Sequence, residues 1–163
     1  VSSVDKIELN GFFSSTYKTY KIFGQNCYGS SGGAIWSFQY NTGASYTALT
    51  SGYYYINDGG TRSSSSQSYN NNNNWNTDHG RIGWNGGGSS SYPCMFEMTI
   101  DNPAGSTRKN ALAHMGGWDA SSKIFVQTGF NHNNNTTAIT GIRFTTNTGT
   151  LNASNVAIFG LKY

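Results

Sequence analysis

Short runs of alternating apolar and polar residues recur along this 163-residue chain, and no segment of useful length repeats its apolar residues at the helical period. The clearest run spans 34–40, where Trp36, Phe38 and Tyr40 alternate with smaller or polar residues. Alternation with a period of two places successive side chains on opposite faces of a strand. The pattern therefore predicts an all-β fold with little or no helix.

Roughly eight to ten short strands, at the spacing typical of an antiparallel β-sandwich, are predicted in all. The other runs lie at 4–9, 17–23, 53–56, 93–100, 109–115, 123–128, 138–144 and 155–163. The segment 109–115 fits a strand or a short helical turn, and its strand neighbours favour the strand. The final run is apolar almost throughout, which predicts a strand covered on both faces. The link before it suits a loop and an edge segment.

One stretch, from about 57 to 91, has no pattern that could form a core. It contains four consecutive serines, five consecutive asparagines and three consecutive glycines. Such composition predicts a long irregular surface loop within a single domain, 1–163. Trp75, Ile82 and Trp84 interrupt the polarity, so part of the loop is expected to dock.

The composition limits the classes of partner. Charged residues make up only 10% of the chain and aromatic residues 15%, so the polar surface must consist of Asn, Ser, Thr and Gly. Aromatic side chains bury enough area to oppose chain entropy, which argues against disorder. The net charge is only +3 and the basic residues are scattered, so we expect no nucleic-acid partner. No apolar run is long enough to cross a bilayer, and we expect no membrane insertion.

No arrangement of residues in the sequence defines a catalytic site. Glycosidase chemistry needs two carboxylates that face each other, and strand alternation gives no reason to pair Asp78 with Asp119. Asp78 and His79 lie near Trp75 and could belong to a metal or hydrolytic site, but the chain lacks His-x-His and HExxH spacing. We therefore expect no enzyme activity, no cofactor and no metal.

The two cysteines leave two alternatives open. Cys27 and Cys94 could form one disulfide or remain as two buried thiols, because a free cysteine behaves as a small apolar residue. No CxxC motif is present, so a zinc knuckle is not expected. The chain begins at Val1 without a methionine, which predicts a processed protein or a fragment of a longer one.

Tryptophans beside asparagine- and glycine-rich segments indicate a binding role. Sugars are held by aromatic faces that stack on their apolar sides and by Asn and Asp groups that bond to their hydroxyls. The candidate glycan contacts are Trp75, Asn76, Asp78, His79, Trp84, Trp118 and Asp119. The alternative is that a large aromatic residue in a long loop docks that loop on the core or packs at a subunit interface.

Three segments occur in an order that is similar to that of a known module. The first spans 3–22 and contains a phenylalanine, then a Thr-Tyr-x-x-Tyr run into a strand. The second, 96–103, is a strand that ends in Asn-Pro, and the third runs from 138 to 162 and closes on Phe159-Gly160-Leu161. Together they resemble the jelly-roll module of tailed-bacteriophage virion proteins. That module has tyrosine where this chain has Phe159, and a glycine where this chain has 153–155.

The resemblance implies an antiparallel jelly-roll β-sandwich that serves without catalysis in the virion, as a homotrimer with other virion proteins as partners. Two roles compete. A tail-fibre head would attach to a host-surface glycan through the loop around Trp75. A capsid decoration protein would stabilise the capsid by binding only its assembled state. A different alternative is a carbohydrate-binding module or lectin-like domain of a secreted protein, which shares the fold chemistry but not the order of the segments.

Overall fold

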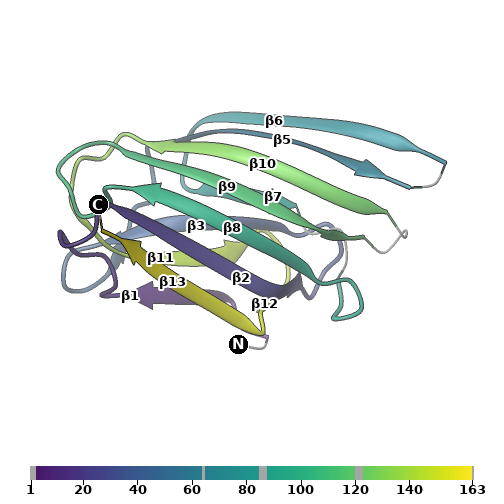
Figure 1. Cartoon of the computed structure of the whole chain (residues 1–163), viewed down its shortest axis with the longest axis horizontal. Coiled ribbons are helices and arrows are strands. Elements are labelled where there is room, and N and C mark those ends of the chain that lie inside the picture. The colour runs from purple at the N-terminus through teal and green to yellow at the C-terminus, as the bar shows by residue number, and fades with distance from the viewer. Residues whose placement is uncertain (1–2, 64, 85–87, 120–122, 163) are drawn as a thin grey trace.

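The computed structural model of this chain describes residues 3–63, 65–84, 88–119 and 123–162. Within these residues every regular element is a strand, and thirteen strands form two antiparallel sheets that pack face to face (Figure 1). The all-β antiparallel sandwich predicted from the alternation is confirmed. The described residues contain no helix that is long and apolar enough to span a membrane.

The chain crosses repeatedly between the two sheets. The smaller sheet consists of β1 (Lys6–Asn10), β11 (Ile139–Thr146), β3 (Ile35–Thr42), β4 (Thr47–Ala48) and β7 (Gly80–Trp84). The larger sheet consists of β13 (Asn155–Leu161), β12 (Leu151–Asn152), β2 (Thr19–Gly29), β8 (Cys94–Asp101), β9 (Lys109–Trp118), β10 (Ile124–Asn133), β5 (Tyr53–Arg62) and β6 (Gln67–Thr77). We call the side of the larger sheet that is turned away from the smaller sheet the outer face.

The core lies between the sheets and is rich in aromatic side chains. The alternating large apolar residues of two strands are all buried: Trp36, Phe38 and Tyr40 on β3, and Phe96, Met98 and Ile100 on β8. The ring of Phe96 lies 5.7 Å from that of Trp36 and 5.4 Å from that of Phe144, between centroids. Each such side chain contributes about 1.5–3 kcal/mol by leaving water, so the alternation of large apolar residues determines which faces meet.

Buried side-chain amides also join β7 to the larger sheet. The Asn131 carboxamide accepts the N–H of Arg81 at 2.7 Å and donates to the C=O of Arg81 at 2.9 Å. The carboxamide oxygen of Gln127 accepts the N–H of Trp84 at 2.8 Å. Because Asn131 and Gln127 lie on β10, these bonds cross the sandwich and satisfy backbone groups of a strand in the opposite sheet.

The expectation of an irregular loop from about 57 to 91 is wrong for most of this stretch. β5 continues to Arg62, β6 contains the asparagine run, and β7 follows. β6 is an edge strand, and its described side chains from 67 to 76 are exposed. Backbone pairing with β5, rather than burial of apolar side chains, makes this segment a strand, so it needs no apolar alternation.

The last strand is tied into the larger sheet, but the expectation that it is covered on both faces is wrong. β13 pairs with β2 and forms part of an edge, and Phe159 is 54% exposed. The short edge segment expected before it is confirmed as β12. Val156 and Ile158 of β13 pack against the core, whereas Phe159 adds to the exposed apolar side chains of the outer face.

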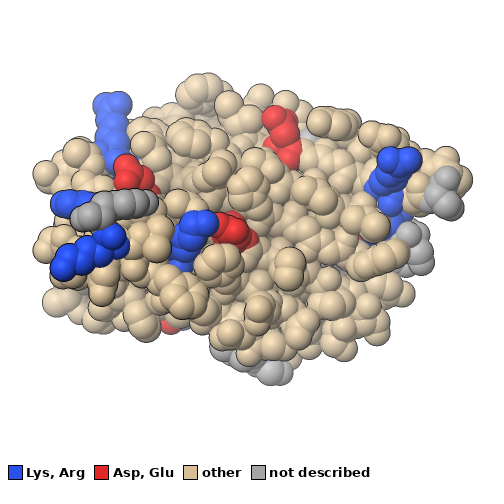
Figure 2. Space-filling model, viewed as in Figure 1, with Lys and Arg blue, Asp and Glu red and all other residues tan. Residues whose placement is uncertain are grey.

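Exposed apolar side chains gather on the outer face. Among the described residues, ten of the twelve exposed large apolar side chains belong to the larger sheet and point outward: Ile56, Tyr69, Trp75, Met95, Leu112, Trp118, Ile124, Val126, Phe130 and Phe159. Figure 2 shows this face, on which most of the charged side chains lie toward the two ends. An apolar surface of this extent is typical of a contact site rather than of solvated surface.

The amide bridge to β7 predicts a large effect of one substitution. Asn131→Ala removes both bonds to Arg81 and leaves a backbone N–H and C=O in a buried site. We expect the free energy of unfolding to fall by about 2–4 kcal/mol, since each unsatisfied buried group costs about 1–3 kcal/mol. Urea unfolding followed by tryptophan fluorescence measures this change. Asn155→Ala, at an exposed position, is the control and should change it by less than about 0.5 kcal/mol. Equal effects of both would contradict the structural role of Asn131.

Candidate functional site

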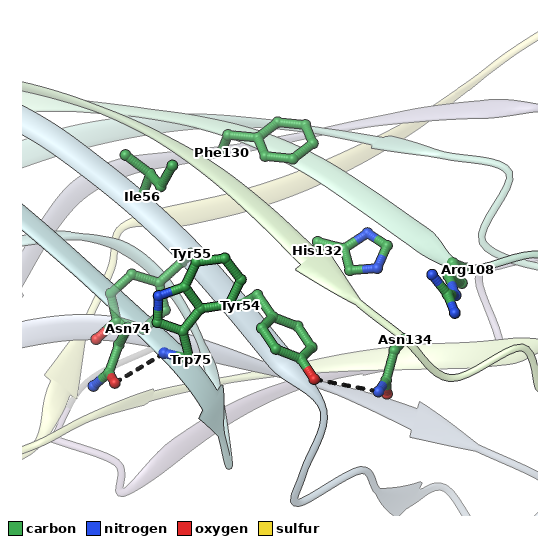
Figure 3. Close-up of a pocket in the computed structure, with 9 residues that line it drawn as sticks. All are labelled: Tyr54, Tyr55, Ile56, Asn74, Trp75, Arg108, Phe130, His132 and Asn134. Carbon is green, nitrogen blue, oxygen red and sulfur yellow. Dashed lines mark hydrogen bonds between the residues drawn. The ribbon is translucent and has the colours of Figure 1, made fainter.

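A groove of about 450 Å³ lies on the outer face where β5, β6 and β10 run side by side (Figure 3). Its lining combines aromatic and aliphatic walls with amide, imidazole and guanidinium groups. The lining residues are Tyr54, Tyr55, Ile56, Asn74, Trp75, Arg108, Phe130, His132 and Asn134. None of these nine lining residues is a carboxylate.

Strand register brings three rings of the groove into one row. Tyr54 on β5 lies directly across from His132 on β10, with ring centroids 6.0 Å apart. Trp75 on β6 packs edge-on against Tyr54, with centroids 5.5 Å apart and planes at 72°. Because the three residues come from neighbouring strands, the row runs across the strands of the sheet.

A β-bulge accompanies Trp75. Tyr55 pairs with Asn74 while Tyr53 pairs with Thr77, so β6 has one residue more than β5 at this point. Asn76, within the bulge, has a φ of +56°, in the left-handed region that asparagine tolerates better than most residues. Bulges change the direction of side chains near binding sites. This bulge comes directly after Trp75 in the sequence of β6.

Hydrogen bonds hold the polar side chains of the groove. The Asn134 amide donates to the Tyr54 hydroxyl at 3.5 Å, and the Asn74 oxygen accepts the N–H of Trp75 at 2.9 Å (Figure 3). Burial, and then the charge of Arg108, lower the pKa of His132 below its ordinary value of 6.5, so the ring is neutral at pH 7. Its Nδ1 lies 2.9 Å from the Asn110 oxygen and acts as donor there, which leaves Nε2 as an acceptor.

The segment around Trp75 divides between the groove and a turn. Trp75 is 74% exposed, so it does not dock the segment on the core. The Asn76 oxygen accepts the N–H of Gly52 at 3.3 Å. Nδ1 of His79 and a carboxylate oxygen of Asp78 form a hydrogen bond of 2.5 Å, and His79 stacks on Tyr55 with centroids 6.4 Å apart. Of these candidates the groove contains Trp75 alone.

The remaining candidate contacts lie elsewhere in the fold. Trp84 is half-buried and packs edge-on against Phe125 at 5.6 Å. Trp118 is 51% exposed on the outer face but pairs with Ile124, eight residues along β10 from His132, or about 27 Å away. Asp119 is buried, and its carboxylate accepts the N–H of Lys123 at 2.9 Å in the β9–β10 turn. The structure therefore does not bring the seven candidates together in one place.

Sequence reasoning missed every groove residue except Trp75, among them Tyr54, Arg108, His132 and Asn134. A signal for two of them was present in the alternation. Tyr54 stands between two buried tyrosines, and His132 continues an outward row on β10 that includes Val126 and Phe130. Apolar residues in an outward row mark a face that is used for contact, whereas the position of Arg108 depends on the path of the chain before β9.

The two cysteines sit opposite each other on β2 and β8 as buried free thiols. The Cys94 thiol donates to the backbone C=O of Cys27 at 2.9 Å. Of the two alternatives that the sequence left open, the structure therefore has two buried thiols and not a disulfide. Burial raises the pKa of Cys27 to about 12 and, together with the nearby Cys27, raises that of Cys94 well above its ordinary value. In the part of the chain that is described, no three His, Cys, Asp or Glu residues group as a metal site would need.

No family model and no curated protein matches this chain. Weak likeness exists to solved structures. A legume lectin-like domain from Entamoeba histolytica has a TM-score of 0.20 and 6% identity, over 96% of this chain and 79% of that one. An aerolysin-like protein from Bombina maxima has a TM-score of 0.17 and 10% identity, over 98% and 87%. A structure of infectious bursal disease virus, Gx strain, has a TM-score of 0.16 and 11% identity, over 95% and 34%. Scores this low carry no argument about fold or function.

Buried hydroxyls and thiols predict a loss of stability at high pH. Burial raises the pKa of Tyr40 and Tyr53 as well as those of Cys27 and Cys94. A group whose pKa is raised by folding stabilises the folded protein fully at any pH below its ordinary pKa, which is 9.0 for Cys and 10.0 for Tyr. That stability is lost as the pH rises toward the pKa of the group in the folded protein. The free energy of unfolding should therefore fall between about pH 9 and about pH 12, by up to about 1.4 kcal/mol per pH unit for each group.

Urea unfolding at a series of pH values measures this slope. Cys27→Ala removes one of the four groups and should make the slope shallower. A free energy of unfolding that stays constant across the range would show that these groups ionise freely in the folded protein.

Proposed function

We propose that this protein is a non-enzymatic attachment component of a bacteriophage particle, which binds a host-surface glycan in the groove beside Trp75. The observation that carries the proposal is the exposed indole of Trp75, set at 72° to Tyr54 and surrounded by neutral and cationic hydrogen-bonding groups. The virion setting is supported by the order of the three sequence segments that resemble the jelly-roll module.

The two rings form a corner that suits a sugar ring. A pyranose presents an apolar C–H side and a rim of hydroxyl groups. The C–H side would lie on the face of Trp75 or Tyr54, and the hydroxyls would meet the amides of Asn74 and Asn134 at the two ends of the row (Figure 3). Apolar walls with a few placed polar groups are the usual construction of a small-molecule site.

The groove is ordered before any ligand enters. Tyr54 is held by its contact with Trp75 and by the hydrogen bond from Asn134, and His132 is held by Asn110. Side chains that are fixed in advance lose less conformational entropy on binding. One shallow groove still binds weakly, so attachment would depend on several copies on one particle.

Two tryptophans on the same face provide a matched test of the groove. Trp75→Ala should weaken binding to host-surface polysaccharide by at least about tenfold, because it removes the stacking surface. Trp118→Ala removes an exposed indole at the far end of the outer face and should leave binding unchanged. Titration calorimetry or a glycan array with purified protein measures both. Equal binding by wild type and Trp75→Ala, or equal loss in the two variants, would contradict the assignment.

The extent of the outer face favours a second candidate function, capsid decoration. Met95, Trp118 and Val126 are each more than half exposed and lie outside the groove. A decoration protein would cover such a face against the assembled capsid. Co-sedimentation with assembled capsids but not with unassembled capsid protein, reduced by Val126→Lys, would favour this role over attachment. Antibody labelling of purified particles separates both roles from that of a secreted carbohydrate-binding module.

A further inference from the structure

The far edge of the larger sheet is open. β6 ends the strand order, and no other strand of the described residues pairs with its free side (Figure 1). It is eleven residues long and contains no charged residue and no proline. Proteins usually protect an edge strand with charges, prolines or short length, because its unpaired backbone groups can pair with another chain. β6 has none of these protections, and its bulge lies near its C-terminal end, after Trp75.

The sequence of β6 is complementary to itself when two copies run antiparallel. Tyr69 and Trp75 lie three residues before and three residues after Asn72, at the two ends of the asparagine run. In an antiparallel pair centred on Asn72, Tyr69 of each copy therefore stands opposite Trp75 of the other. Every asparagine of the run meets an asparagine. The arrangement is closed by a two-fold axis, as is usual for homodimers.

The exposed side chains agree with this register. Tyr69 is 78% exposed and Trp75 is 74% exposed, the two highest values among the exposed large apolar residues of the described chain. Both point to the outer face, so the two rings would meet on the same side of the joined sheet. Cross-strand aromatic pairs stabilise antiparallel strands. Between Gln67 and Asn74 the pairing of β6 with β5 has no register shift, since the bulge follows Trp75.

We propose that two copies of this chain associate through their β6 strands, antiparallel and centred on Asn72, so that their larger sheets become continuous. The association covers the open edge and pairs the two exposed rings. The groove keeps its own lining and gains Tyr69 of the second copy beside Trp75. The proposal does not depend on a glycan, because Asn72 is outside the groove.

Cysteine trapping tests the register directly. In Asn72→Cys the new thiol meets its own copy at the two-fold axis, where directly opposed residues lie about 4.5–5.5 Å apart, within reach of a disulfide. Asn73→Cys is the control, because residue 73 faces 71 of the second copy and lies diagonally about 7–8 Å from its own copy. The native cysteines are buried and should not compete. Mild oxidation should link Asn72→Cys into a dimer on non-reducing gels at least about tenfold faster than Asn73→Cys. Equal rates would overturn the register.

The unmodified protein tests the association itself. Multi-angle light scattering at micromolar concentration should give a mass that rises toward twice the chain mass of 17.7 kDa. Asn72→Lys places two ammonium groups opposite each other and should give a monomer, whereas Asn72→Thr, which keeps a good strand residue, should remain a dimer. A wild-type monomer, a trimer, or a dimer that persists in Asn72→Lys would overturn the proposal. Circular dichroism verifies that each variant is folded, and glycan binding by the Asn72→Lys monomer would show that the groove acts independently.

Discussion

Hydrogen bonds from buried amides of β10 to the backbone of β7 fix the register in which these two strands of opposite sheets face each other. Asn131 pairs with both backbone groups of Arg81, in the manner of a bridge between strands, although the strands belong to different sheets. A slip of one residue would turn every side chain of β10 to the other face. It would expose Asn131 and bury His132, so the same bonds that join the sheets also place an imidazole in the groove.

The polarity of β10 is the reverse of the usual pattern for a half-covered strand. Its inward side includes Gln127, Asn131 and Asn133, which are buried, while its outward side includes Val126 and Phe130, which are exposed. The interior tolerates the amides because each bonds to backbone of a neighbouring segment. The apolar outward row costs solvation in a monomer in water, and contact with a ligand or another chain removes that cost.

How far the sequence predicts the structure depends on which force holds each segment. At 34–40 and 93–100 large apolar side chains alternate, and burial decides the strands, so the expectation was correct. At 67–77 the backbone ladder to β5 decides, and ladder bonds leave no trace in the order of apolar residues. The groove requires the register of β5, β6 and β10 together. Residue chemistry alone could indicate Trp75, but it could not indicate Tyr54 or His132 as its neighbours, because tertiary pairing sets them.

An edge that pairs with itself would explain three features that have no common cause in a monomer. The edge lacks charge, since like charges directly opposite would repel in a symmetric pair. The run between Tyr69 and Trp75 is a single residue type, and a uniform run matches its own reverse. The two aromatic residues are equally distant from Asn72, which a two-fold pairing requires and an isolated edge does not. Joined sheets would also hold two grooves in fixed orientation on one face. A repeating glycan could then engage both, so that weak single contacts add up to firm attachment.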